Sequence, residues 1–184
     1  MGNHILHRQN KTPLPVIADG KGAYLIDRDG KHYLDGSGGA AVSCLGHGHP
    51  KVIEAIKSQL DKVAFAHTGF FTNEPAEELA DYLCSRAPDG FGRVVFSAGG
   101  TESVEAALKI ARQIHTEKGD MDRSHIIARR QSYHGASLAA MSTGYHVQRR
   151  KTYAPMLLNA TMSHIAPPYA YRLQHDGASA EGFV

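Results

Sequence analysis

The sequence predicts an α/β fold, with an antiparallel meander and helices near the amino terminus and alternating strands and helices after them. Between residues 14 and 35, short apolar runs alternate with Asp-Gly pairs, a pattern typical of hairpins because glycine supplies the positive φ of a tight turn. From residue 93 onward, apolar runs of strand length alternate with amphipathic segments of helix length. That alternation is typical of parallel strands layered with helices.

The predicted meander has three short strands, at residues 15–18, 23–27 and 31–35. Asp19-Gly20 and Asp29-Gly30 are expected to form the turns between them. A loop of small residues follows at positions 36–41, and such a loop allows the backbone to approach a ligand or another chain closely.

Two helices are expected between this loop and residue 90. Pro50 begins the first, because proline suits the first helical position, and apolar residues then recur at helical spacing. The second begins within residues 72–75 and ends before Pro88. We place the domain boundary in this part of the chain, with residues 1–75 before it and residues 76–184 after it.

The second half is predicted to alternate strand and helix. Its segments are a strand at 93–97, a helix at 101–116, a strand at 125–128, a helix ending at Met141 and a strand at 157–165. Parallel strands end at the same edge of a sheet, and ligands of open α/β sheets bind beyond that edge. Polar and glycine-rich motifs directly after these strands are therefore candidate ligand-binding residues.

Composition narrows the function classes. The net charge is +2 with neutral histidines, which favours neither nucleic acid nor an anionic membrane as a partner. There is no run of about 18 apolar residues for a membrane span, and residues 1–11 lack the apolar core of a signal peptide. Cys44 and Cys84 are expected to be reduced thiols of a cytoplasmic protein.

Residues 96–102 lead from a predicted strand through a glycine turn into a helix. The first amides of a helix lack partners within it and carry about half a positive charge. Gly99 and Gly100 leave room for a phosphate at these amides, and Thr101 can add a hydroxyl. The spacing matches neither a Walker A loop nor Gly-x-Gly-x-x-Gly. The alternative is a tight turn in which Thr101 is only a helix cap.

Tyr133, His134 and Gly135 follow the next predicted strand. Tyr133 could stack on a flat aromatic ring, and both strand ends could then meet one ligand. The alternative is an exposed aromatic residue in a loop. His47 and His49 stand two apart in a glycine loop, but without a third ligand at suitable spacing, and no metal site is expected there.

Four blocks of the sequence resemble class III aminotransferases, which depend on pyridoxal 5'-phosphate (PLP). The blocks are Tyr24-Leu25-Ile26-Asp27-Arg28-Asp29-Gly30 with Tyr33-Leu34-Asp35, Leu45-Gly46-His47-Gly48-His49-Pro50, Gly100-Thr101-Glu102-Ser103-Val104-Glu105-Ala106-Ala107-Leu108-Lys109, and Tyr133-His134-Gly135. They occur in the family's order and extend over about residues 14–170. The resemblance implies a small-domain segment in residues 1–75 and the first part of a fold-type-I PLP-binding large domain in residues 76–184.

The resemblance also implies cofactor-binding residues. Gly100 and Thr101 would bind the PLP phosphate, Tyr133 would stack on the pyridine ring, and His134 would lie beside it. Where many relatives have Asn-Ser before this glycine, the chain has Ala98-Gly99, which removes side-chain donors but keeps the backbone amides.

A second set of residues, Gly38, Gly39 and Ala40, would line the substrate entrance. The implied reaction moves an amino group from an amine or amino acid to an α-keto acid, in a homodimer. A decarboxylase or aminomutase reaction is the alternative within the family.

The Schiff-base lysine and the carboxylate that pairs with the pyridinium nitrogen lie on later strands in the family. No matching segment occurs in residues 1–184, and Lys109 and Lys151 do not match that lysine and are expected to be surface charges. We therefore expect an amino-terminal fragment that is inactive and incompletely folded alone. The alternative of a different class is a non-catalytic chain that acts as an interaction partner.

Overall fold

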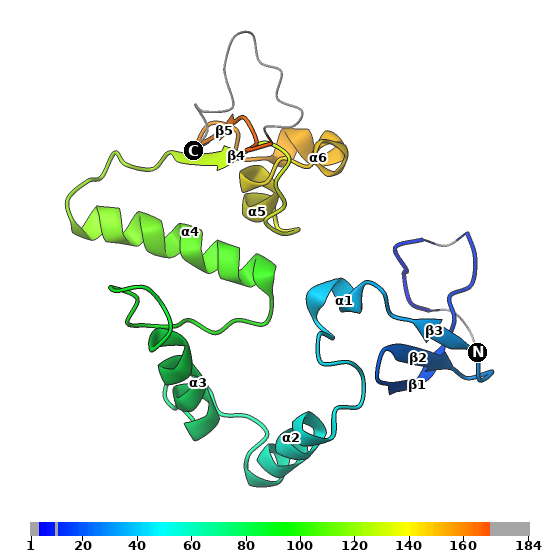
Figure 1. Cartoon of the computed structure of the whole chain (residues 1–184). Helices are drawn as coiled ribbons and strands as arrows, with labels where there is room; N and C mark the ends of the chain where they lie inside the picture. The colour runs from blue at the N-terminus through cyan, green and yellow to red at the C-terminus, as the bar shows by residue number, and fades with distance from the viewer. Residues whose placement is uncertain (1–3, 10, 170–184) are drawn as a thin grey trace. The chain divides into compact units, whose positions relative to one another are not determined.

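A computed structural model describes residues 4–9 and 11–169 of the chain. The chain divides into two compact units, Met1–Leu79 and Ala80–Val184. Helix α3 (Glu74–Cys84) contains the point of division, and the boundary expected between residues 75 and 76 falls within the same helix (Figure 1). Among the described residues, no helix combines the length and the apolar character needed to cross a membrane.

The first unit contains the predicted meander, which the structure confirms as a three-stranded antiparallel sheet in the order β1-β2-β3. The strands are β1 (Ile17–Lys21), β2 (Tyr24–Asp27) and β3 (His32–Leu34). The turn expected at Gly30 is present, with a φ of 81°. The sheet is built from contacts that are local in sequence.

The turn expected at Asp19-Gly20 was wrong. Both residues lie within β1, where Asp19 pairs with Ile26 after a register shift. The chain instead turns at Gly22, whose φ of 57° suits a residue without a side chain. The register shift explains the error, because it moves the end of the strand beyond the Asp-Gly pair.

The turn between β2 and β3 is organised by the buried carboxylate of Asp27. It accepts hydrogen bonds from the backbone N–H groups of Asp29 at 3.0 Å and Lys31 at 2.9 Å, and from the Tyr33 hydroxyl at 2.8 Å. These bonds, with the one from Lys31 first, lower the pKa of Asp27 because they favour the charged form. Asp27 therefore fixes this turn by local charge-assisted bonds.

Both helices expected before residue 90 are confirmed. Helix α2 spans Pro50–Lys62, with the proline at its start. Helix α3 begins after Asn73, whose Oδ1 accepts a hydrogen bond from the Ala76 N–H at 3.1 Å. Neither helix contains a buried residue, although both carry apolar stripes.

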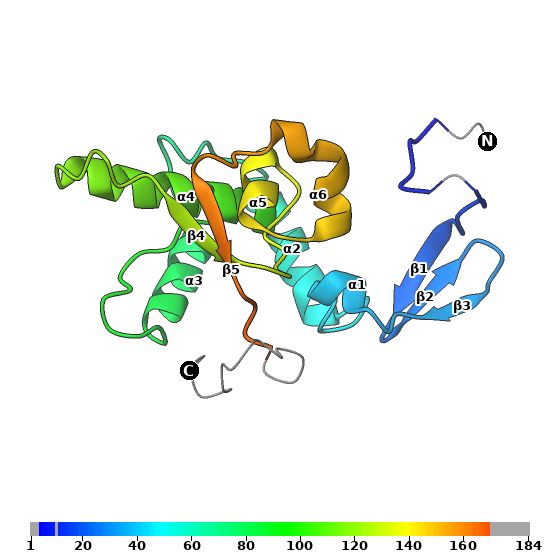
Figure 2. The same cartoon turned by 90° about the horizontal axis from the view of Figure 1, so that it is seen from above.

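The second unit contains helices and parallel strands, as predicted, but three helical segments follow one another between the two strands of its described residues. Its elements are α4 (Gly100–Glu117), β4 (Ile126–Arg129), α5 (Leu138–Thr143), α6 (Val147–Tyr153), the 3₁₀ helix η1 (Ala154–Met156) and β5 (Met162–Ile165). Strands β4 and β5 lie side by side and pair in parallel (Figure 2). The expected strand at 157–165 is thus confirmed only in its second part, and α6 was not predicted.

The predicted buried strand at residues 93–97 was wrong for this chain. The segment forms no strand, and the side chains of Val95 and Phe96 are 64% and 49% exposed. Its apolar sequence is that of a strand covered on both faces, but among the described residues the parallel sheet contains only β4 and β5. A strand needs a hydrogen-bonding neighbour, and the segment has none there.

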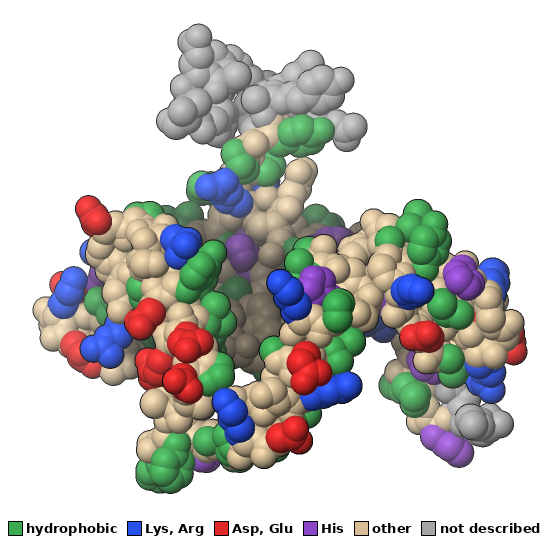
Figure 3. Space-filling view, turned by 60° about the horizontal axis from the view of Figure 1, so that its bottom comes forward, with side chains coloured by type: hydrophobic (Ala, Val, Ile, Leu, Met, Phe, Trp, Pro, Cys, Tyr) green, Lys and Arg blue, Asp and Glu red, His purple; other side chains and the backbone are tan. Residues whose placement is uncertain are grey.

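The core of the second unit is small. The buried apolar side chains of the described residues are those of Ala128, Ala140, Leu157 and Met162, which come from β4, α5, the segment after η1 and β5. Many larger apolar side chains of the described residues are exposed, and Figure 3 shows hydrophobic side chains at the surface in one view. The described residues therefore leave many large apolar side chains uncovered.

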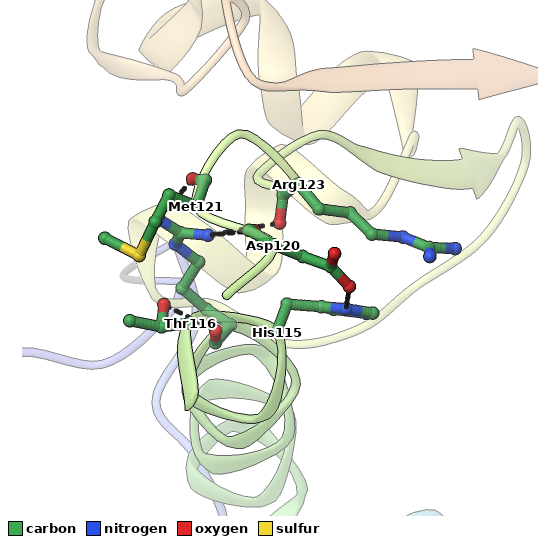
Figure 4. A network of polar contacts seen from close by, with 6 residues as sticks. His115, Thr116, Asp120, Met121 and Arg123 are labelled. Carbon is green, nitrogen blue, oxygen red and sulfur yellow. Dashed lines mark hydrogen bonds and ion pairs between the residues drawn. The ribbon is translucent and has the colours of Figure 1, made fainter. Parts of the chain in front are cut away.

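The loop between α4 and β4 is held by polar contacts to the end of the helix (Figure 4). Arg112 donates to the carbonyl oxygens of Met121 at 2.7 Å and Arg123 at 3.3 Å, while His115 contacts the Asp120 carboxylate at 3.4 Å. These contacts bring the chain back from α4 toward β4. They are made at the C-terminal end of α4, and the candidate site lies at the start of the same helix.

Candidate cofactor site

The start of α4 presents free backbone amides. Gly99 is the N-cap residue and, having no side chain, makes no cap hydrogen bond. A methyl group built on Gly100 would meet no atom within 4 Å, so the space beside this residue is open. The Glu102 carboxylate lies close to Gly99, where the helix start favours negative charge.

The approach to this helix start is fixed by two serines. The hydroxyls of Ser97 and Ser103 are 2.5 Å apart, so that one donates to the other, and their oxygens lie 3.3 Å and 3.1 Å from the Gly99 carbonyl oxygen, which accepts from the hydroxyl whose hydrogen remains free. The glycine turn therefore has a defined geometry although residues 93–97 form no strand.

Thr101 connects the helix start to the loop that carries Tyr133. Its Oγ1 accepts a hydrogen bond from the Ala136 N–H at 3.2 Å, across 35 residues of sequence. A hydroxyl that accepts such a bond keeps its own hydrogen available for donation to another acceptor. The structure thus brings Thr101 next to the segment of Tyr133 and His134, as the sequence suggested for one ligand.

The same two segments are joined a second time. Ser137 caps α5 by accepting from the Ala140 N–H at 3.2 Å, and its hydroxyl donates to Glu105 on α4 at 2.5 Å. Neither Glu105 nor Ser137 was singled out from the sequence, because a contact between residues 32 apart leaves no local pattern. Together with Thr101, Glu105 fixes the Tyr133 loop against the first turns of α4.

Tyr133 is exposed, and its ring contacts a guanidinium. Its side chain is 58% exposed, and the Arg149 guanidinium lies 4.8 Å from the ring centroid. Arg149 lies on α6, and its neighbour Arg150 donates to the Met141 and Gly144 carbonyl oxygens at 2.7 and 2.8 Å. His134 is partly buried beside this loop.

Gly38, Gly39 and Ala40, the expected substrate-entrance residues, belong to the first unit. The loop expected there is a short helical turn, α1 (Gly38–Ala41), in which all four residues have left-handed φ between 57° and 70°. Left-handed backbone is unfavourable for alanine, so surrounding contacts must hold this turn.

Asp35 provides those contacts. Its carboxylate accepts from the Ser43 hydroxyl at 2.9 Å, contacts His47 Nε2 at 2.9 Å, and accepts from the Gly39 N–H at 3.3 Å. The hydrogen bonds from Ser43 and His47 lower the pKa of Asp35 to about 2. Asp35 was quoted from the sequence only as part of a motif, and no sequence signal marked it as a centre of contacts.

His47 also attaches this segment to the meander. Its backbone N–H and carbonyl oxygen both bond to Gly22, at 2.7 and 3.0 Å. The absence of a side chain at Gly20 allows the approach, since a methyl group there would lie 2.8 Å from the His47 Cβ. No group of three or more potential metal ligands occurs among the described residues.

The residues at the start of α4 fit a phosphate. Uncapped amides, an open space at Gly100 and a hydroxyl with a free hydrogen are the groups that bind a phosphate at a helix start. The exposed Tyr133 ring, on the loop bonded to that start, fits the planar ring of a phosphorylated cofactor such as PLP.

Known proteins similar to this chain are aminotransferases. The family model for class-III aminotransferases matches residues 5–182. An uncharacterized aminotransferase of Schizosaccharomyces pombe is 40% identical over 182 residues, which cover 99% of this chain and 39% of that protein. The adenosylmethionine-8-amino-7-oxononanoate aminotransferase of Nitratidesulfovibrio vulgaris is 38% identical over 165 residues, or 88% of this chain and 30% of that enzyme. The chain thus spans two fifths or less of these relatives.

Similar solved structures are also aminotransferases or transaminases. An (S)-enantioselective omega-transaminase from Thermomicrobium roseum superposes with a TM-score of 0.85 at 34% identity, covering 98% of this chain and 41% of that one. Adenosylmethionine-8-amino-7-oxononanoate aminotransferase from Methanocaldococcus jannaschii gives 0.82 at 33% identity, covering 90% and 39%. These neighbours confirm the expected α/β fold as part of a fold-type-I transaminase. The chain belongs to the class-III aminotransferase family.

Proposed function

We propose that this chain supplies the phosphate-binding and ring-stacking part of a PLP-dependent aminotransferase. The observation that carries the proposal is the hydrogen bond between Thr101 and Ala136, which joins an uncapped helix start to the loop of an exposed tyrosine. PLP, when bound, supplies an electron-withdrawing ring that stabilises negative charge on the substrate carbon next to nitrogen. The residues of this chain bind and orient that ring.

Each site residue has a separate task in this proposal. The N–H groups of Gly100 and Thr101 hold the phosphate, and the Thr101 hydroxyl donates its free hydrogen to a phosphate oxygen. The Tyr133 ring covers one face of the cofactor and keeps water from it, with His134 beside it. Gly38, Gly39 and Ala40 line the entrance for the substrate.

The substrates that we propose are an amine or amino acid and an α-keto acid, in a homodimer of the whole protein. The names of the relatives support the reaction class, since two of them are named adenosylmethionine-8-amino-7-oxononanoate aminotransferase. Cys44 and Cys84 are free thiols, which supports a reducing compartment such as the cytoplasm.

We propose further that residues 1–184 alone do not turn over substrate. Lys109 lies exposed on α4 and Lys151 lies exposed on α6, and neither contributes to the arrangement around Thr101. Without a positioned amine, the chain lacks general acid–base help worth about 10²–10⁴-fold. Borohydride reduction with PLP, followed by peptide mapping, should label no single lysine stoichiometrically. Stoichiometric labelling of Lys109 or Lys151 with turnover would contradict this part of the proposal.

The cofactor site is tested by replacing Gly100 with valine in the longest natural polypeptide that carries these residues. The new side chain would meet no protein atom within 4 Å at its Cβ but would occupy the space proposed for phosphate. We expect the Kd for PLP, measured by fluorescence titration, to rise at least about tenfold. Gly92→Val is the matched control, since Gly92 also has open space at its Cβ. Equal PLP affinity in wild type and Gly100→Val would reject the site.

A further inference from the structure

Gly135 packs against the start of α4 more closely than any residue with a side chain could. It is buried, and its φ of 135° is rare for residues other than glycine. A methyl group built on it would lie 2.6 Å from Thr101 Oγ1, 2.9 Å from the Ala140 Cβ and 3.0 Å from the Thr101 Cα. Two of these atoms are in well-held positions, because Ala140 is buried in α5 and the Thr101 Cα is helix backbone.

This close approach has a consequence for the next amide. Because Gly135 lies against Thr101, the N–H of Ala136 reaches Oγ1 at 3.2 Å. That bond occupies an acceptor site of the hydroxyl and sets the direction in which its own hydrogen can be donated. The hydroxyl is therefore oriented by the backbone of the Tyr133 loop.

The contact between Gly135 and Thr101 also fixes the distance between the start of α4 and the Tyr133 ring. Tyr133 stands two positions before Gly135, and Thr101 is the second residue of α4. Attaching Gly135 to Thr101 therefore sets the separation between the free amides of the helix start and the Tyr133 ring. A ligand that uses both must carry its anion and its planar ring at that separation.

We propose that Gly135 is a positioning residue for cofactor binding. By allowing the Ala136 amide to bond to Thr101, it orients the Thr101 hydroxyl toward a phosphate and holds Tyr133 at the spacing of a phosphorylated planar ring. This inference rests on the proposed function, since the ligand is the same. It assigns to Gly135 and the Ala136 amide a role that neither the resemblance nor the family match provides.

The experiment compares four variants in the longest natural polypeptide that carries these residues. Gly135→Ala removes the close approach, and Thr101→Val removes the acceptor. Thr101→Ser restores an acceptor. Gly119→Ala is the matched control, because Gly119 also has a positive φ, of 85°, but has open space at its Cβ. Circular dichroism checks that each variant is folded.

The first readout, hydrogen exchange of the Ala136 amide, needs no cofactor. We expect its protection to be lost in Gly135→Ala and Thr101→Val but kept in Thr101→Ser and Gly119→Ala. The second readout is the Kd for PLP, which should rise about tenfold or more in the first two variants and much less in the last two.

The outcomes separate the two proposals. If the wild-type protein binds PLP but Gly135→Ala binds it equally well, the role of Gly135 is overturned and the cofactor site still stands. The same conclusion follows if Gly119→Ala loses as much PLP affinity as Gly135→Ala does. A wild-type protein that binds no PLP overturns the proposed function and this inference together, even if the Ala136 amide is protected.

Discussion

The two units hold their candidate site segments in different ways. In the first, the Asp35 carboxylate collects groups no more than 12 residues away, and a complete antiparallel sheet lies beside it in the sequence. In the second, Thr101 bonds to a residue 35 positions away, and residues 93–97 lack a strand partner among the described residues. Local contacts complete the first arrangement, whereas the second depends on segments that are distant in sequence.

The largest expected effect of this difference is on the folding of residues 1–184 when they are produced alone. Exposed apolar side chains in the second unit, and the free edges of β4 and β5, favour association. We expect aggregates or a non-cooperative unfolding transition by light scattering and urea titration. In hydrogen exchange, the amides of β2 should be more protected than those of residues 93–97.

A monomer with one cooperative unfolding transition in dilute solution would contradict this expectation. Equal protection of β2 and residues 93–97 would contradict the contrast between the units. A longer polypeptide that carries these residues provides the comparison, because additional strands would raise the protection of residues 93–97 without affecting the meander.

The sequence-based predictions succeeded mainly where structure depends on local contacts and failed mainly where it depends on segments that are distant in sequence. The three strands of the meander and helices α2, α3 and α4 were predicted, because alternation, proline at a helix start and apolar spacing are local patterns. The strand at 93–97 was predicted from its apolar composition. Such a composition indicates that a segment is suited to a buried position, but it does not show whether a neighbouring strand is present to pair with it. The turn at Gly22 was missed, because the Asp19-Gly20 pair gave a stronger turn signal, and its glycine lies two residues before Gly22.

The site was predictable in part. The glycine turn before α4 indicated an anion site, and Tyr133 was named as a ring partner. Asp35 and the Ala136 amide could not be identified, because their importance lies in contacts that only the folded chain forms. An amide carries no sequence signal at all, and an aspartate after a strand is common.

A smaller effect on local stability is expected from Asp35→Asn, which tests the contacts of the Asp35 carboxylate in the first unit. Asn keeps the size but removes the charge that favours hydrogen bonds from Ser43 and His47. We expect faster hydrogen exchange at Gly39 and a less stable α1 turn, with the exchange of β1, β2 and β3 unchanged. Asp29→Asn is the control, since among the described residues no hydrogen bond reaches the Asp29 carboxylate.

The pH dependence of this arrangement has a defined sign. The pKa of Asp35 is lowered to about 2, chiefly by the hydrogen bonds from Ser43 and then His47. A carboxylate with a lowered pKa stabilises the folded state above its ordinary pKa of about 4, and this contribution is lost as the pH falls toward 2. An NMR titration of the Asp35 carboxyl should show this low midpoint, and a midpoint near 4 would contradict the contacts seen here.

The smallest effect is expected from Arg149→Met, which tests how the Tyr133 ring is held in the second unit. The guanidinium lies 4.8 Å from the ring centroid, and such a pair at an exposed site contributes about 0.5–1 kcal/mol. Methionine keeps an unbranched side chain but loses the charge, so the ring should become more mobile and the Kd for PLP should rise by about two- to fivefold. Arg86→Met is the matched control, because Arg86 lies 3.7 Å from the Tyr82 ring centroid, in a cation–π pair that does not include Tyr133. Equal losses in the two variants would show a general effect of removing charge, and an unchanged Kd in Arg149→Met would show that the contacts of Gly135 and Thr101 hold Tyr133 without Arg149.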